Sequence, residues 1–163
     1  MLLKSFGVAI LLACAASPAW ADAQSDCQAA AGSLLTGVVV SEPAFAAGKS
    51  RRGTELSHTR LSLKADQDGR VYHVAIDNVF AAGYDSAGDS VPPDLDKIHK
   101  GTRLQLCGQL FSRGIGIHWV HMNCADRPTE AEPNGWTKIV NPDGSLSPNL
   151  AANGKYCGLW RRH

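Results

Sequence analysis

His58 and Arg60 stand two residues apart in a segment, residues 54–64, in which polar and apolar side chains alternate. In a β-strand, residues two apart point to the same face, so these two side chains share one surface. Arg60 can hold a carboxylate or a phosphate through two parallel hydrogen bonds, and His58 can donate a hydrogen bond or transfer a proton. The pair predicts a binding site for a polar or anionic group. The alternative interpretation is an ordinary solvated outer face.

The run from Ile117 to His121 contains a second pair of histidines, which flank Trp119. Histidines three apart converge on a metal ion in a helix, but this run has the character of a strand, where residues three apart face opposite sides, about 10 Å apart along the chain. His118 and His121 can therefore share one site only if the strand ends or bulges between them. We predict that one lines the site while the other is a hydrogen-bonded structural residue, with no metal bound. Trp119 is first a packing residue and second a candidate stacking platform.

Other motifs with known chemistry are missing from the sequence. It has no Gly-x-Ser-x-Gly elbow, phosphate loop or dinucleotide fingerprint, so we expect no cofactor. Residues Asp66 to Gly69 lack the remaining ligand positions of a calcium loop and are predicted to form a hairpin turn. The sequence also does not single out a pair of carboxylates that could carry out glycoside hydrolysis. The sequence therefore leaves open whether the protein is an enzyme.

Five predicted strands would position these residues. Turn sequences rich in Gly, Asp and Ser separate segments with a period of two, and a proline begins one or two helical turns before the fourth strand. The order predicts a mainly β fold, a five-stranded OB-like Greek-key barrel with a short helix between strands 3 and 4, which binds ligands on its strand 2–3 face. Other small barrel and sandwich folds remain alternatives. The expected strands are 36–40, 54–64, 70–80, 102–111 and 115–123, with helical turns at 92–98, a short helix at 28–35 and an edge strand at 135–140.

Four cysteines are expected in the mature chain, at Cys27, Cys107, Cys124 and Cys157. None belongs to a Cys-x-x-Cys pair, which disfavours zinc-ribbon and thioredoxin-like sites. Four cysteines in an exported domain predict two disulfides with three possible connectivities. Because Cys27 and Cys157 lie near the two ends of the mature chain, at least one bridge is expected to tie an extension to the barrel.

The first residues predict export. Lys4 precedes about eleven apolar residues, and Ala19-Trp20-Ala21 then gives the small-x-small pattern of a signal-peptidase site. The apolar run is too short for a membrane span, which needs about twenty residues. A lipoprotein modified at Cys14 is the alternative. We predict a signal peptide at 1–21 and one periplasmic or secreted domain at 22–163, with a barrel core at about 36–140 and a disulfide-tethered tail at 141–163.

Charge narrows the possible partners. The chain has 16 Lys and Arg against 15 Asp and Glu, and loss of Lys4 with the signal peptide makes the mature chain neutral. A general nucleic-acid binder usually carries a basic excess, so that class is disfavoured. No later apolar segment is long enough to span a membrane. The expected partner is an unknown polar or anionic ligand or another protein, and the oligomeric state stays open.

Five short segments form a series: His58 to Leu61, Val74 to Asn78, Gly101 to Gly108, Gly116 to His121, and Gly135-Trp136. In order and spacing they resemble a family of small exported bacterial proteins, domain of unknown function three-four-six-five. The resemblance covers about residues 36–140 and implies one exported domain with a polar cluster of His58, Arg60, His118 and His121, but no established activity. This chain has Met122, Asn123 and Cys124 where the family has histidine, aspartate and proline, which puts in doubt any metal or acid/base site built on those groups.

Three functions fit these observations. The first is a non-catalytic OB-like binding module for a polar or anionic group or a protein partner. The second is a small hydrolase, with phosphodiesters as candidate substrates, in which His58 or His121 is the general base and Arg60 stabilises charge. The third is an inhibitor or immunity-type protein that blocks an exported enzyme.

Overall fold

The computed structural model describes residues 18–125 and 127–160 of the 163-residue chain. The signal peptide predicted at residues 1–21 therefore lies almost wholly outside the described residues. In the described part of the chain, no helix is both long and apolar enough to cross a membrane.

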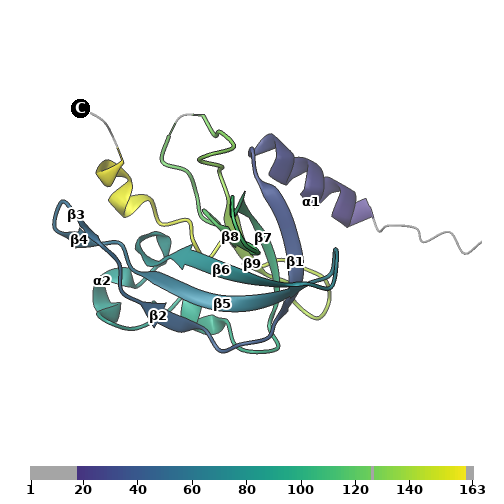
Figure 1. The fold of residues 1–163 in the computed structure, drawn as a ribbon, viewed down its shortest axis with the longest axis horizontal. Helices are drawn as coiled ribbons and strands as arrows, with labels where there is room; N and C mark the ends of the chain where they lie inside the picture. The colour runs from purple at the N-terminus through teal and green to yellow at the C-terminus, as the bar shows by residue number, and fades with distance from the viewer. Residues whose placement is uncertain (1–17, 126, 161–163) are drawn as a thin grey trace, which may run out of the picture.

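Five strands close into a barrel (Figure 1). Around the barrel the order is β1, β5, β6, β8, β7 and back to β1, and only the β6–β8 pair is parallel. Numbered along the chain, this is the order 1-2-3-5-4-1 of an OB-type Greek-key barrel. The predicted fold class is confirmed. The strands are β1 (Ser33–Val39), β5 (His58–Ala65), β6 (Val71–Asp77), β7 (Arg103–Leu110) and β8 (Gly116–His118).

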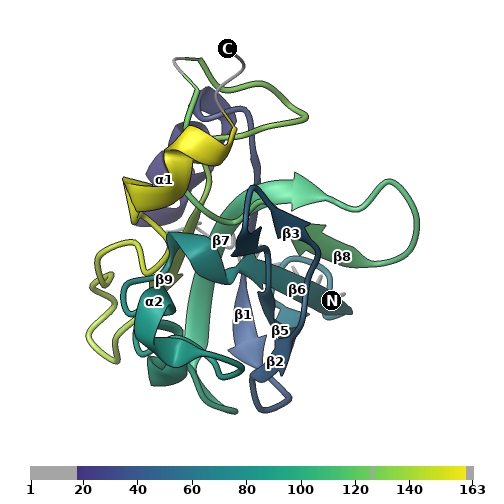
Figure 2. The same cartoon turned by 90° about the vertical axis from the view of Figure 1, so that its left-hand side faces the viewer.

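Shorter elements surround the barrel. Helix α1 packs beside β1, while α2 and the C-terminal helix η3 lie at the opposite end, next to the β3–β4 hairpin (Figures 1 and 2). The helical turn expected before the fourth strand is present as η2, and the predicted edge strand is β9, paired with β7. These elements are α1 (Pro18–Ala29), β2 (Ala44–Ala46), β3 (Ser50–Arg51), β4 (Thr54–Glu55), η1 (Asn78–Phe80), α2 (Tyr84–Ala87), η2 (Leu95–Lys97), β9 (Trp136–Ile139) and η3 (Gly154–Leu159).

The barrel interior is filled by every second residue of its strands. Leu61 and Leu63 of β5 and Leu104 and Leu106 of β7 are almost fully buried, and burying one such side chain stabilises the fold by about 1.5–3 kcal/mol. The intervening residues of β5 must then point outward. The observed burial of β5 alternates as the sequence predicts, so the inward leucines fix the outward direction of His58 and Arg60.

Several element boundaries differ from the prediction. The helix expected at 28–35 lies earlier, as α1, because Ser33–Val39 pairs with β7. The strand expected at 54–64 is two strands, β4 and β5. The strand expected at 115–123 ends at His118, because Trp119 adopts a left-handed backbone conformation. At the end of β7, Leu110 is 42% exposed, unlike the buried Leu104 and Leu106 of the same strand.

Two disulfides join the extensions to the barrel, as predicted. Cys27 of α1 bonds to Cys107 of β7, and Cys124 bonds to Cys157 of η3. Gly32 lies against the first bridge, where an added Cβ would stand 2.5 Å from Cys107 Sγ, so only glycine allows this approach. The second bridge fastens the tail three residues beyond His121.

Removing either bridge should cost stability, because each closes a long loop in the unfolded chain. We expect the Cys27→Ser/Cys107→Ser and Cys124→Ser/Cys157→Ser double variants each to lose about 2–4 kcal/mol of unfolding free energy. Urea denaturation of the oxidised proteins measures the loss. Midpoints equal to that of the wild type would show that the bridges do not stabilise the fold.

Candidate functional site

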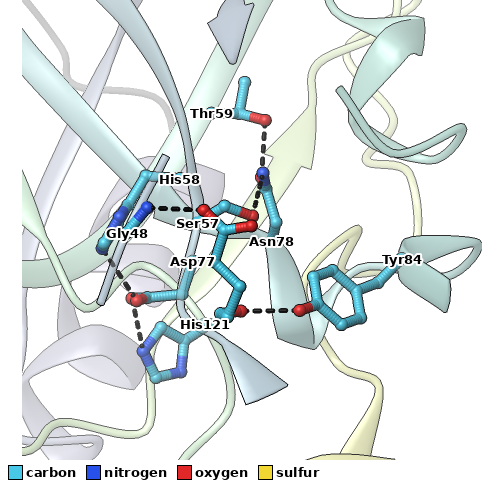
Figure 3. Close-up of polar contacts among 9 residues, drawn as sticks. Gly48, Ser57, His58, Thr59, Asp77, Asn78, Tyr84 and His121 are labelled. Atoms are coloured by element: carbon cyan, nitrogen blue, oxygen red, sulfur yellow. Dashed lines mark hydrogen bonds and ion pairs between the residues drawn. The ribbon is translucent and has the colours of Figure 1, made fainter. Parts of the chain in front are cut away.

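The centre of the site is the carboxylate of Asp77, at the end of β6. Asp77 Oδ1 lies 3.0 Å from His58 Nε2, and Oδ2 lies 3.1 Å from His121 Nε2 (Figure 3). His58 stands directly opposite Asp77 in the β5–β6 register. One carboxylate therefore holds two of the histidines that the sequence singled out, from segments 63 positions apart in the chain.

Hydrogen bonding fixes the ring of His121. Its Nδ1 lies 2.7 Å from the Met122 carbonyl oxygen, which can only accept a hydrogen bond. Its Nε2 faces the ionised Asp77 carboxylate, which also only accepts. Both ring nitrogens therefore face oxygen acceptors, an arrangement in which His121 is fixed by contacts on both sides of its ring.

His121 is buried, with 2% of its surface exposed. The ring of Phe80, from η1, stacks on it with the ring centroids 3.8 Å apart and the planes 8° apart. The ring of Trp119 also lies next to the His121 ring, with the centroids 5.1 Å apart and the planes tilted by 34°. This enclosure holds the ring beside Asp77 and makes His121 a positioning residue with little access to solvent.

The backbone leaves the extended conformation at Trp119, whose φ is +55°. This conformation is an outlier for a bulky residue, and it ends β8. Gly135 makes the turn possible, because a Cβ there would lie 2.4 Å from the Trp119 carbonyl oxygen. Gly108 allows the backbone of His118 to approach in a similar way, because a Cβ at Gly108 would lie 2.4 Å from the His118 carbonyl oxygen. The strand therefore ends between His118 and His121. This is the condition under which the two histidines can belong to one site.

His118 lies on the outer face, half buried, with the edge of the Phe111 ring against it at 5.3 Å between centroids. Burial lowers the pKa of His118 below its ordinary value of 6.5, a shift that the charge of Asp77 opposes and the nearby His121 and His58 reinforce. At neutral pH His118 is therefore a neutral imidazole that can both accept and donate a hydrogen bond.

Arg60 is exposed on the same outer face. In the β5–β6 register it stands opposite Ala75, and the β6–β8 register, continued by one residue, brings Ala75 beside His118. A small side chain thus separates Arg60 from His118. Among the described residues, the Arg60 guanidinium has no hydrogen bond or ion pair from its side chain.

The structure thus joins His58 and His121 through Asp77 and places Arg60 and His118 on the same outer face. Trp119 is partly exposed beside the ring of His121, and its Nε1 is buried with no hydrogen-bond partner among the described residues. Its role as a stacking platform stays a prediction. Asp77 and Phe80 were not selected from the sequence. The alternation of residues 70–80 placed Asp77 on the polar side of its strand, but only the register shows that it meets His58.

Among the residues that the structure describes, no group of three His, Cys, Asp or Glu side chains is arranged to hold a metal ion.

No protein-family model and no curated protein matches the chain. The resemblance drawn from the sequence therefore stays a prediction, and the functional argument rests on the geometry of the site.

Asp77→Asn should destabilise the protein in a pH-dependent way. Burial raises the pKa of Asp77, but hydrogen bonds from His121 and His58 outweigh it and hold the pKa well below the usual 3.8. The unfolded chain therefore takes up this proton at a higher pH than the folded chain, and the stabilisation is present above about pH 4 and lost as the pH falls.

We expect Asp77→Asn to lose about 3 kcal/mol at pH 7, and the gap from wild type to narrow below about pH 4. Urea denaturation at several pH values measures both. Asp96→Asn, an exposed carboxylate outside the site, is the control and should change stability by under about 0.5 kcal/mol. A gap that is constant with pH would contradict the bridging role of Asp77.

Proposed function

We propose that this protein binds a small anionic group, such as a phosphate or carboxylate, on the outer face of β5, β6 and β8. The observation that carries the proposal is the exposed Arg60 guanidinium, which has no carboxylate partner among the described residues. His58 lies two residues before it on β5, and His118 lies beyond the small Ala75 of β6. A free guanidinium beside imidazole donors suits the planar, charged oxygens of such groups.

The charges of the site favour an anion. Both oxygens of Asp77 are occupied by His58 and His121, and Arg60 adds a positive charge with no ion pair among the described residues. His58 uses Nε2 on Asp77, so its Nδ1 donates to an anion only when the ring is protonated and accepts a hydrogen bond when the ring is neutral. His118 is neutral at neutral pH and gains charge in mild acid, so binding should strengthen as the pH falls.

The site lies on an outer strand face, and the cavities of about 270 and 370 Å³ are lined by other residues. An open face suits an anionic group carried by a larger ligand or by a protein partner. The strand 2–3 face, here β5 and β6, is where OB barrels commonly bind their ligands.

A hydrolase is the second candidate function, favoured by the His58–Asp77 contact. A carboxylate that orients a histidine is the arrangement by which enzymes prepare a general base. His58 would take the proton of an attacking hydroxyl, and Arg60 would stabilise the charge that develops on the substrate. The inhibitor hypothesis stays a prediction from the sequence.

Arg60→Ala tests the proposed site. We expect the affinity for inorganic phosphate to fall at least about tenfold, which is about 1.4 kcal/mol, while stability changes by under about 0.5 kcal/mol because the side chain is exposed. The measurement is a titration followed by NMR, with urea denaturation in parallel. Lys64→Ala is the matched control, since Lys64 is an exposed cation on the same face of the same strand.

Equal losses in the Arg60 and Lys64 variants would show general attraction between charges and would overturn the proposal. A loss of several kcal/mol of stability in Arg60→Ala would show that the arginine is structural. Turnover of a phosphodiester that disappears in His58→Ala would favour the hydrolase instead.

We also infer that the protein acts in the periplasm or outside the cell. Two disulfides persist in an oxidising compartment and are rare in the cytosol. The mature protein should begin at Asp22 and lack four hydrogens relative to the fully reduced mass. Intact mass spectrometry of material from the periplasm or medium checks both, and free thiols at the four cysteines would contradict the inference.

A further inference from the structure

A cavity of about 270 Å³ lies apart from the histidine site, at the end of the barrel where the β3–β4 hairpin, α2 and η3 meet. Its volume is suited to a ligand smaller than a drug-sized molecule. No lysine, arginine or histidine lines it. The lining residues are Gly53, Thr54, Glu55, Ser57, Tyr84, Asp85, Gly88, Asp89 and Tyr156.

Three of the lining residues are carboxylates, and two of them are not neutralised. Asp85 is paired with Lys155 at 2.7 Å and accepts a hydrogen bond from Tyr156. Glu55 accepts a hydrogen bond from the backbone of Gly48 at 2.9 Å through Oε1. Asp89 is exposed and has no side-chain hydrogen bond or ion pair among the described residues. The cavity therefore carries a negative excess.

Arg51 and Arg52 precede Gly53 in the chain but do not line the cavity. The Arg52 guanidinium donates to the Gly158 carbonyl, and the Arg51 guanidinium lies over the ring of Trp160, 5.7 Å from its centroid. Burial raises the pKa of Tyr84, and the charges of Glu55 and Asp85 raise it further. The phenol thus experiences the same negative field.

Two aromatic rings form part of the wall. Tyr84 and Tyr156 meet edge to face, with centroids 5.3 Å apart. The ammonium group of Lys155 lies over the Tyr156 ring at 5.3 Å while it is bonded to Asp85. The chain's own ammonium thus shows that this surface, an aromatic face beside a carboxylate, accommodates a cation.

A buried hydroxyl is directed into the cavity as well. Thr59 donates to Asn78 Oδ1 at 2.7 Å, and Asn78 Nδ2 donates to Ser57 Oγ at 3.1 Å (Figure 3). Ser57 is 2% exposed and lines the cavity. Its oxygen already accepts, and its own hydrogen has no acceptor among the described residues. The chain of hydrogen bonds thus ends in a donor that is available to a ligand.

We propose that this cavity binds a small organic cation, an amine whose ammonium group meets Glu55 and Asp89 and whose polar end accepts a hydrogen bond from Ser57. The site is independent of the proposed anion site, since the two share no side chain. Ser57, which directly precedes β5, lines the cavity, whereas His58, the first residue of β5, belongs to the anion site.

Three probes of nearly equal size test the charge requirement: 4-amino-1-butanol, 1,4-butanediol and 4-hydroxybutyrate. NMR titration of the full mature protein should show saturable shifts of the Gly53 and Gly88 amides with the amino alcohol only. Equal binding of the diol would identify a site for neutral polyols and overturn the proposal, as would preferred binding of the carboxylate or no saturable shift with any probe.

Variants of the wall test the residues. We expect Asp89→Asn to weaken binding of the amino alcohol about tenfold, as expected for loss of a charge-assisted hydrogen bond, and Glu55→Gln to act in the same direction. Asp96→Asn, an exposed carboxylate that does not line the cavity, is the matched control. Equal affinities in the Asp89 and Asp96 variants would overturn the proposal, and Asp89 is exposed, so its variant should fold normally.

Discussion

The structure around the candidate site depends on the Asp77 carboxylate. Asp77 ends β6, lies opposite His58 across the sheet, and directly precedes η1, whose Phe80 stacks on His121. A single residue thus links the outer barrel face, the long β6–β7 connection and the chain beyond β8. Because each carboxylate oxygen meets one histidine, His58 is fixed in orientation while its ring stays accessible, and His121 is held inside the protein.

Placing His121 inside the protein requires a costly backbone conformation at Trp119. Residues of this kind persist only where the surroundings over-determine them. Here the surroundings are two glycines that admit the backbone, a hydrogen bond from the Met122 backbone to Ala151, and the Cys124–Cys157 bridge. The tail, which seems peripheral in the sequence, therefore secures the segment that carries His121. The bridge also fixes η3, and Trp160 directly after η3 places its ring 5.2 Å from the Phe80 ring, measured between centroids.

The alternation of residues 54–64 was enough to predict β5 and the shared outward face of His58 and Arg60, because inward leucines leave little choice of face. Alternation does not specify the strand register, so the pairing of His58 with Asp77 could not be predicted. The end of β8 could not be predicted either, since Ile117 to His121 has strand character and the turn depends on Gly108 and Gly135, which are distant in sequence. Local preference also placed a helix at 28–35, but the helix ends at Ala29 and pairing with β7 imposes a strand from Ser33.

Net charge is a poor guide to the local field of this protein. The near balance of acidic and basic residues disfavours a general polyanion binder, but the fold separates the charges in space. Arg60 stands on the outer face of β5 without an ion pair among the described residues, whereas Glu55 and Asp89 both line the cavity that Ser57 also lines. Since side chains alternate along a strand, two consecutive residues can serve fields of opposite sign. Clefts and faces lined by one sign attract ligands of the other sign even when the whole protein is neutral, so the ligand preferences of this chain follow from strand geometry and not from composition.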